Sequence, residues 1–464
     1  MLRENLKLRN IKFGIIALIC SVTFVSCDDA INVDPADEIV ESNAILNVDD
    51  VDSAVTGVYG TMAANNAIYW NALITDELHL PTSNNGQGIQ VHTWAISSGD
   101  GTANGIFSNY YRTINTANRV LAAIPGITPA DADEEATLNS LEGQLLAIRG
   151  WAHFKLLTYF SSSYTNDAAL GVPYLDYVVV LEKPARNTVG EVFAGIASDL
   201  TTAASLIPTT FTDNVLFTRD AVTALEARIA LYREDFPTAI SKSSGLISDY
   251  ALATTTNYPD IWQDVNDDEN IFKLARVVGD GAVGQLFNAN SVLIYWVASD
   301  KLTAMYDPAD VRLSSFIQSS DNKILKYPGD VANVGLNHIK EFRISEQYLI
   351  RAEAYARSSQ IGLAEDDINE LRGNRIPGAV DVTFSGETDA VDQILEERYR
   401  ELAFEGHRFL DLKRLGKGIE RNSSDCDILA ATACSMSNSD HRFTLPIPQA
   451  EIFTNPNMEP NPGY

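Results

Sequence analysis

The chain has 464 residues, of which 45% are hydrophobic and 21% are charged, a composition typical of a folded globular protein with a large apolar core. Its 34 Lys and Arg residues stand against 62 Asp and Glu residues, which gives a formal net charge of −28 at pH 7. Because nucleic-acid binding needs clustered cations that neutralise phosphates, this charge argues against a nucleic-acid partner.

The N-terminal segment has the pattern of a secretory signal. A mostly apolar run over residues 13–25 follows four basic residues, Arg3, Lys7, Arg9 and Lys12. A membrane-spanning helix needs about 20 apolar residues, so this run is too short to span. It ends at Ser26 and Cys27, and a small residue followed by Cys resembles the bacterial lipoprotein box. We therefore expect residues 1–26 to be a signal peptide and Cys27 to carry the lipid that attaches the protein to the membrane. An ordinary signal cleaved near Ser26, with Cys27 a plain thiol, is the alternative.

Residues 27–45 form an acidic, non-periodic stretch that we interpret as a solvated tether. Its beginning resembles the acidic export signal that follows the lipidated Cys in surface lipoproteins of Bacteroidetes. We expect residues 46–464 to form a single domain.

Helical periodicity dominates from Asp50 onward, and strand-like segments are fewer and shorter. Helices are predicted over residues 51–64, 108–124, 137–160, 189–206, 219–249, 345–374 and 389–415. The sequence therefore predicts a mainly α fold. The intervals 65–107 and 251–343 break this rhythm with Gly, Asn, Pro and Trp, and long irregular insertions are usual places for binding surfaces.

Two of the predicted helical segments share one spacing of small and large residues. Ala227, Ala230, Phe236 and Ala239 recur 125 residues later as Ala352, Tyr355, Ile361 and Ala364. Small residues let antiparallel helices approach closely, so the pattern resembles a tetratricopeptide repeat and predicts a rigid scaffold. Coincidence between Ala-rich amphipathic helices is the alternative, because one offset pair is a thin repeat signal.

The sequence lacks the motifs of common enzyme classes. It contains no G-x-S-x-G, H-E-x-x-H, G-x-x-x-x-G-K-[ST], or G-x-G-x-x-G that opens a helix after a strand. The six His residues are scattered, without a second ligand at helical spacing. Residues 264–268 begin like a calcium loop, but Glu269 replaces the turn Gly and Ala275 replaces the closing Glu. We predict no catalytic residue, no metal and no cofactor.

Three segments resemble the SusD/RagB family. Residues 397–414, E-R-Y-R-E-L-A-F-E-G-H-R-F-L-D-L-K-R, match its signature E-R-x-R-E-L-x-x-E-G-x-R-x-x-D-L-x-R. Residues 111–118 match its early helix as Y-R-x-I-x-x-A-N, and residues 445–464 resemble its C-terminal ending. The resemblance spans nearly all of the chain after the signal peptide.

The resemblance implies a SusD-like scaffold of tetratricopeptide-like helix pairs, with long irregular insertions that carry the ligand face. It also implies an outer-membrane lipoprotein, facing the cell exterior, that captures oligosaccharides and delivers them to a SusC-like TonB-dependent transporter. Some relatives bind peptides, so peptide capture on the same scaffold is the second hypothesis. A lipid-anchored hydrolase is the third.

The charged residues of the signature alternate in sign at three- and four-residue spacing, as ion pairs within and between helices do. They are Glu397, Arg398, Arg400, Glu401, Glu405, Arg408, Asp411 and Arg414. We interpret them as part of the scaffold and not of a ligand site.

Sugar rings have apolar faces and polar rims, so their binding sites combine exposed aromatic rings with amide or charged groups. The predicted ligand-binding residues are Trp94, Trp296, Tyr295, Trp70, Tyr69, Asn84 and Asn85. Trp94 and Trp296 are the foremost candidates for exposed platforms, whereas Trp151 is expected in the core. For each of these aromatic residues, including Trp262, the alternative is a large side chain that fixes a loop to the scaffold.

Cys426 and Cys434 lie in a polar stretch, residues 422–440. In an exported protein such a pair could form a disulfide that staples a loop, and two Cys without nearby His make a poor zinc site.

Overall fold

The structure of the protein is a computed structural model that describes residues 44–288, 293–426 and 433–464. The chain divides into two units, Met1–Leu46 and Asn47–Tyr464. The predicted signal peptide and the predicted acylation site, Cys27, lie outside the described residues, so their roles stay predictions.

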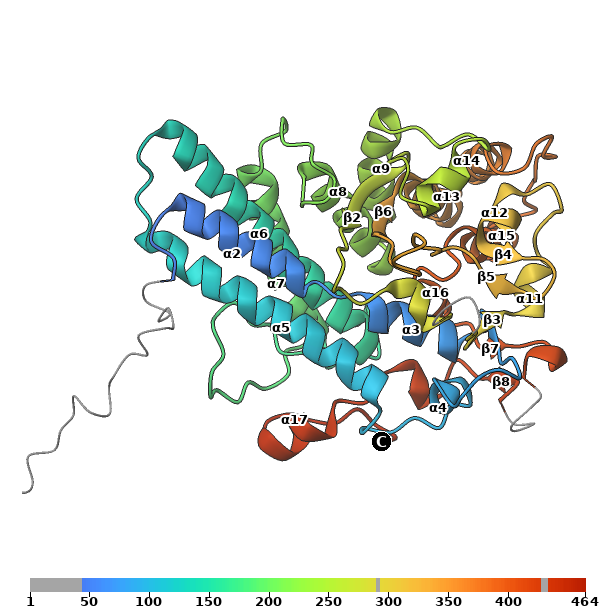
Figure 1. Cartoon of the computed structure of the whole chain (residues 1–464), viewed down its shortest axis with the longest axis horizontal. Coiled ribbons are helices and arrows are strands. Elements are labelled where there is room, and N and C mark those ends of the chain that lie inside the picture. Colours follow the sequence, from blue (N-terminus) through green and yellow to red (C-terminus); the bar gives the residue numbers. More distant parts are fainter. Residues whose placement is uncertain (1–43, 289–292, 427–432) are drawn as a thin grey trace, which may run out of the picture. The chain divides into compact units, whose positions relative to one another are not determined.

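Helices dominate the second unit, and the prediction of a mainly α fold is confirmed (Figure 1). The longer helices are α2 Val48–Thr61, α3 Asn65–Ile74, α5 Gly101–Ala123, α6 Ala132–Phe160, α7 Val189–Leu206, α8 Arg219–Tyr232, α9 Phe236–Asp249, α13 Ile344–Arg357, α14 Ile361–Gly373 and α15 Glu387–Glu401. The shorter ones are α4 Ile89–His92, α10 Tyr258–Trp262, α11 Asp300–Thr303, α12 Val311–Phe316, α16 Arg408–Arg414 and α17 Gln449–Thr454.

Side-chain caps determine where the predicted helices begin. Helix α7 occupies the predicted residues, because Thr188 and Glu191 form a capping box around its first turn. Helices α5 and α6 begin earlier than predicted. Asp100 and Asp131 cap their first backbone N–H groups, and the first turns are too polar to show an apolar period.

The predicted helical repeat is present as two helix pairs. Helices α13 and α14 each begin 125 residues after α8 and α9. The turns inside the two pairs also match, since Glu234 and Ser359, at the same offset, both have a left-handed backbone with φ of 59°. Because the helix starts and the turns also match, the shared spacing is a true structural repeat and not a chance similarity between two Ala-rich helices.

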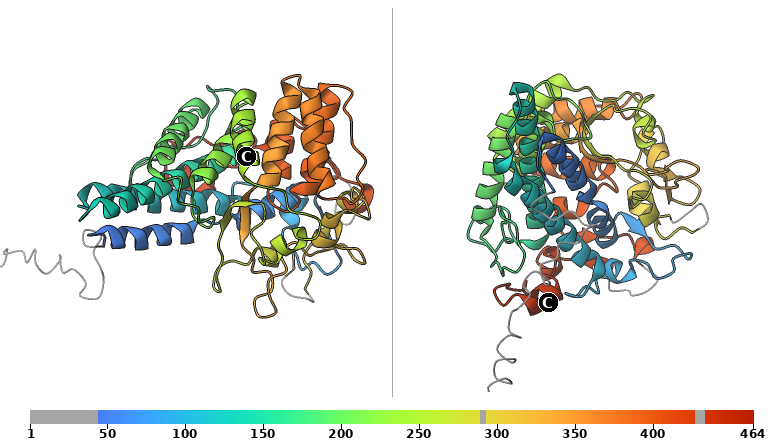
Figure 2. Two further views of the ribbon diagram at one scale, coloured as in Figure 1. Left: turned by 90° about the horizontal axis from the view of Figure 1, so that it is seen from above. Right: turned by 60° about the vertical axis from the view of Figure 1, so that its left-hand side comes forward.

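Small side chains allow the helices of these pairs to stack closely. Ala227 and Ala239 are fully buried in the first pair, and Ala352 and Ala364 are fully buried in the second. Helix α9 packs against α13, so the stack continues from α6 and α7 through both pairs to α15 (Figure 2). The tetratricopeptide-like scaffold is confirmed.

The two intervals predicted to be irregular contain short helices and strands. Helix α3 lies in the first interval and α10 in the second. Trp70 and Trp262 therefore lie in helices, and the prediction that these two residues belong to irregular segments is wrong. Helix α3 shows no amphipathic period because seven of its ten residues are buried.

The strands are short and pair antiparallel. They are β1 Leu78–His79, β2 Asn270–Leu274, β3 Val297–Ala298, β4 Ile317–Gln318, β5 Lys323–Ile324, β6 Ile339–Arg343, β7 Ile419–Glu420 and β8 Ser435–Met436. They form a four-stranded sheet in the order β1-β3-β5-β4 and two two-stranded sheets, β2-β6 and β7-β8. Strand β1 thus brings the segment after α3 beside residues 297–298, more than 200 residues later.

The charged residues of the family signature form buried ion pairs, as predicted. Arg400 pairs with Glu397 inside α15, and Arg398 pairs with Asp411 of α16. Glu401 is fully buried and its carboxylate contacts three guanidinium groups, those of Arg312, Arg343 and Arg375. These residues join α15 to its neighbours and therefore belong to the scaffold.

Candidate ligand-binding site

The two foremost candidate platforms, Trp94 and Trp296, are buried, with 5% and 0% of their surface exposed. The indole N–H of Trp94 donates to the carbonyl oxygen of Ile74 at 2.9 Å. The indole N–H of Trp296 donates to the carbonyl oxygen of Gln87 at 3.1 Å and to the hydroxyl of Tyr69 at 3.2 Å. The expectation of exposed indole faces is therefore wrong for both residues. Each ring holds two segments of the chain together.

The remaining tryptophans are buried as well. Trp151 is a core residue, as expected, and its indole N–H donates to the Glu341 carboxylate at 3.1 Å. Trp70 and Trp262 are buried in α3 and α10. Trp70 belongs to the predicted ligand-binding set, but its ring faces the core.

The other predicted residues meet at one place, which we call the rim and define as residues 83–88 and 294–296. The Ser83 hydroxyl donates to the Ile294 carbonyl oxygen at 2.8 Å. The Asn84 side-chain amide donates to the carbonyl oxygen of Tyr295 at 2.7 Å and to that of Gln87 at 3.1 Å. These hydrogen bonds join two segments that lie about 200 residues apart in the sequence.

Tyr69 of α3 lies directly beneath the rim. Burial raises the pKa of its hydroxyl to about 12, so the hydroxyl keeps its proton at neutral pH. Gly88 has φ of 72°, and a Cβ atom there would lie 2.7 Å from the Leu73 side chain and 2.8 Å from the Tyr69 hydroxyl. Only glycine permits this approach of the loop to α3.

The rim has exposed amide groups, and half-buried tyrosines lie within it and next to it. Asn85 and Gln87 are exposed, and Tyr69 and Tyr295 are half-buried. Amides donate and accept hydrogen bonds, and a tyrosine ring offers a flat apolar surface with a polar edge. This combination matches the hydroxyl groups and C–H faces of a sugar.

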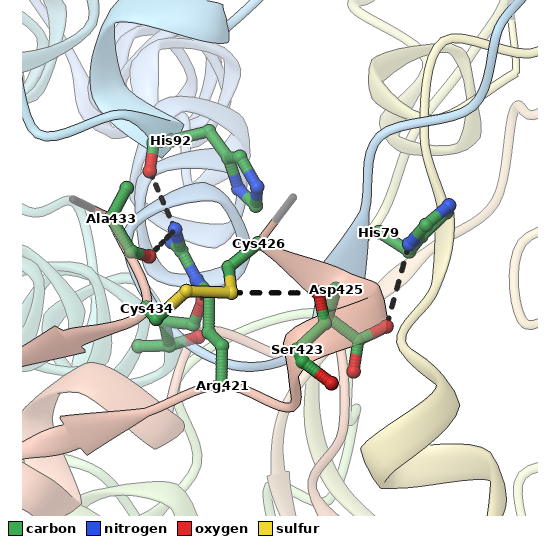
Figure 3. The surroundings of a disulfide bond; sticks show 9 residues. His79, His92, Arg421, Ser423, Asp425, Cys426, Ala433 and Cys434 are labelled. Carbon is green, nitrogen blue, oxygen red and sulfur yellow. Dashed lines mark hydrogen bonds and ion pairs between the residues drawn. A yellow bond between two sulfur atoms is a disulfide. The ribbon is translucent and has the colours of Figure 1, made fainter. Parts of the chain in front are cut away.

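A second layer of residues supports the rim from behind. The His92 ring lies 4.7 Å from the Trp296 ring, and the Arg421 guanidinium lies 4.7 Å from the Trp94 ring. Next to Arg421, Cys426 and Cys434 form a disulfide with their Cα atoms 5.1 Å apart (Figure 3).

The predicted ligand-binding residues do not include His92, Arg421 or Gln87, although Gln87 belongs to the same amide-rich stretch as Asn84 and Asn85. The amide-rich composition around Gln87 was a usable signal. Arg421 lies outside the family signature, in a polar stretch with no motif, and nothing in the sequence indicates its partners.

Within the described ranges, no group of three or more His, Cys, Asp or Glu residues is placed to hold a metal ion. In the same ranges, no helix combines the length and the apolar character needed to cross a membrane.

The fold and the rim together define a helical-repeat scaffold with a polar, tyrosine-containing surface site. Two family models match the chain: one described as "SusD family" over residues 316–464, and one described as "Starch-binding associating with outer membrane" over residues 32–231. The chain belongs to the SusD family, as its sequence resemblance predicted.

Relatives and solved structures agree with this assignment. SusD-like protein P2 of Formosa agariphila is 24% identical, and the match covers 98% of this chain and 100% of the relative. A crystal structure of a SusD superfamily protein from Bacteroides vulgatus is 28% identical with a TM-score of 0.80, covering 90% of this chain and 100% of that one. A putative sugar binding protein from the same organism is also 28% identical, with a TM-score of 0.78 and coverage of 91% and 99%.

Proposed function

We propose that this SusD-family protein is a non-catalytic, glycan-binding lipoprotein on the outer face of the outer membrane. It captures oligosaccharides and delivers them to a SusC-like TonB-dependent transporter. The description of one matching family model and the sugar-binding description of one structural neighbour support this class of ligand. The acidic net charge of −28 favours neutral or weakly charged glycans over anionic ones.

One observation carries the proposal for the binding site. The rim combines exposed amides with a half-buried tyrosine, and hydrogen bonds between residues 83–84 and 294–295 join its two segments before any ligand arrives. A site that is ordered in advance loses little conformational entropy on binding. The tryptophans contribute by supporting the rim, and the contacts to sugar are made by Asn85, Gln87 and Tyr295.

The test uses the soluble form that lacks residues 1–27. Calorimetry measures its affinity for a panel of soluble polysaccharides that includes starch, xylan, pectin and laminarin. Gln87→Ala and Tyr295→Ala are expected to weaken binding of the best-bound polysaccharide by about tenfold each, which is the effect of losing a contact worth about 1.4 kcal/mol. Gln360→Ala and Tyr177→Ala, at exposed positions outside the rim, are the matched controls. If both rim variants bind the polysaccharide as tightly as the wild type, the binding site lies elsewhere on the protein.

Delivery to a transporter needs its own experiment. The lipidated protein is purified from outer membranes in mild detergent, and a TonB-dependent transporter is expected to copurify with it. Purification without any transporter, together with unchanged glycan uptake in a strain lacking this protein, would contradict delivery.

Peptide capture is the second candidate function. A groove of about 370 Å³ lies between α7 and α8, with apolar side chains of Phe193, Ile196, Leu200 and Ile229 in its lining. Apolar grooves between helices also suit peptides. A peptide panel measured in parallel would favour this function if peptides bind and polysaccharides do not. Product analysis after incubation with the bound glycan tests for a hydrolase.

A further inference from the structure

The Cys426–Cys434 disulfide joins two short segments, here called arms, which form hydrogen bonds to different parts of the candidate site. One arm is Asp425 with Cys426, and the other is Arg421 with residues 433–434. We call these residues, Arg421, Asp425, Cys426 and 433–434, the clasp (Figure 3).

The first arm holds the chain that follows Trp296. The buried Asp425 carboxylate accepts hydrogen bonds from the backbone N–H groups of Asp300 at 2.8 Å and Lys301 at 3.1 Å. These amides open α11, directly after β3, so a carboxylate at this helix N-terminus is favourably placed. Tyr295 and Trp296 immediately precede β3, and Asp425 therefore anchors this side of the rim.

The second arm holds the opposite side of the rim through the backbone. Arg421 donates to the carbonyl oxygens at the end of α3, those of Leu73 at 3.0 Å, Ile74 at 3.1 Å and Thr75 at 2.8 Å. It also donates to the carbonyl oxygen of His92, at 2.7 Å, at the end of α4.

The same arginine is bound to the disulfide-closed loop. Its backbone N–H donates to the Cys434 carbonyl oxygen at 2.8 Å, and its guanidinium donates to that of Ala433 at 3.0 Å. Among the described residues Arg421 forms no ion pair with a carboxylate. The negative carbonyl end of α3 compensates its charge, as helix C-termini do for cations.

Both arms reach the exposed amides through one short chain of contacts. The His92 ring lies 4.7 Å from the Trp296 ring at a tilt of 49°, and the Trp296 indole N–H donates to the Gln87 carbonyl oxygen. Residues 84–88 and residues 294–296 thus meet over a support whose two halves are linked by the short backbone segment 421–425, and a second time by the disulfide, which holds residues 433–434 against Arg421.

We propose that the clasp is a positioning element for ligand binding: the Cys426–Cys434 bond, through Asp425 and Arg421, fixes the spacing between the two segments of the rim. This proposal rests on the proposed function of the rim. It differs from the simpler expectation that the disulfide staples a polar loop, because a loop staple would leave the distant residues 84–88 unaffected.

The first test compares the wild-type protein with the double variant Cys426→Ser/Cys434→Ser. The wild type is also treated with dithiothreitol, which supplies two electrons and two protons to the disulfide and itself becomes a cyclic disulfide. Backbone hydrogen exchange is measured over residues 84–96 and 294–301, with residues 344–373 of α13 and α14 as the internal control. Ser439→Ala, exposed in the same polar stretch, is the matched control variant.

We expect exchange at the rim to rise by about tenfold, with exchange in α13 and α14 unchanged, because local opening is separable from global unfolding. Unchanged exchange at the rim would overturn the proposal, and so would a uniform rise across the protein, which would show a purely structural role.

The second test measures affinity for the best-bound polysaccharide of the panel. The double Ser variant and Arg421→Lys are expected to lose about tenfold in affinity, since a lysine cannot reproduce the guanidinium's set of hydrogen bonds to carbonyl oxygens. If Gln87→Ala and Tyr295→Ala weaken binding while the clasp variants do not, the clasp proposal fails and the proposed site stands. If no rim variant weakens binding, the proposed site fails, and hydrogen exchange alone decides whether the clasp holds the rim.

Discussion

The guanidinium of Arg375 and the carboxylate of Glu401 form an ion pair with both side chains fully buried, and Nε lies 3.0 Å from Oε2. Arg343 adds a second contact, with Nη1 at 2.8 Å from Oε1. Burial alone would raise the pKa of Glu401, but the surrounding guanidinium groups hold it well below its usual range. The carboxylate thus stays charged inside the protein because several cations share it.

We expect Glu401→Gln to lower the free energy of unfolding by about 3–5 kcal/mol, because it removes one of the buried carboxylates that neutralise the guanidinium groups of Arg312, Arg343 and Arg375. Denaturant titration measures this change. Asp392→Asn is the control, since the Lys417–Asp392 pair is exposed and such pairs contribute at most about 1 kcal/mol. The folded fraction of Glu401→Gln should keep its affinity for polysaccharide. A loss of affinity at unchanged stability would place Glu401 in the binding site.

Acid should destabilise the protein through the same cluster. Burial alone would raise the pKa of Glu397, but Arg312 and Arg400 lower it to about 2. A carboxylate whose folded pKa lies below its unfolded value of 4.5 stabilises the fold above that value and loses this contribution as pH falls towards 2. The loss should be on the order of 3 kcal/mol for Glu397 alone. Unfolding free energies measured between pH 5 and pH 2 should therefore fall less steeply for Glu397→Gln than for the wild type. The exposed control Glu387→Gln should keep the wild-type slope.

The small residues of the helical repeat predict a packing effect. Ala239 and Ala364 are fully buried at equivalent places in the two helix pairs. Replacing either with Leu should cost about 1–3 kcal/mol, because the added atoms force the helices apart. Ala194→Leu, at an exposed position of α7, should change stability by less than about 0.5 kcal/mol. Denaturant titration measures all three effects. Equal effects at the three positions would mean that close helix packing does not explain why the same residue spacing occurs in both helix pairs.

The scaffold was predictable because its signals are local. The period of α7 and its cap at Thr188 lie within one short stretch of sequence, and each copy of the repeated spacing, from Ala227 and from Ala352, is itself short. Helix α3 was not predicted because it lacks such a signal: it is buried on most sides, and its residues show no polar face.

The candidate site was predictable in its composition but not in its contacts. The sequence placed Tyr69, Asn84 and Tyr295 among the binding candidates, and the structure brings them together. It could not indicate that the Trp296 indole would meet Gln87, 209 residues away, and so become buried. Which aromatic ring faces solvent depends on such distant partners, and local sequence does not encode them.

The anchoring prediction concerns Cys27. If it carries the only membrane attachment, Cys27→Ala should move the protein from the membrane fraction to the soluble fraction. Fractionation with a carbonate wash measures this, and protease treatment of intact cells tests exposure of the wild type at the surface. Cys426→Ser serves as the control, because it removes a cysteine that is not expected to be acylated. A Cys27→Ala protein that resists the wash would contradict the lipid anchor.

The burial of Trp296 reverses what its substitution should do. An exposed platform would lose binding on truncation and keep its stability. A fully buried indole that bonds Tyr69 and Gln87 should instead cost about 3–5 kcal/mol of stability when replaced by Ala, since a large cavity opens in the core. Trp296→Ala should therefore melt at a lower temperature, whereas Gln87→Ala, at an exposed position, should melt like the wild type and bind polysaccharide weakly. Differential scanning calorimetry and binding measured on the same samples separate the two behaviours. A Trp296→Ala protein with unchanged melting and abolished binding would show that the indole meets the ligand directly.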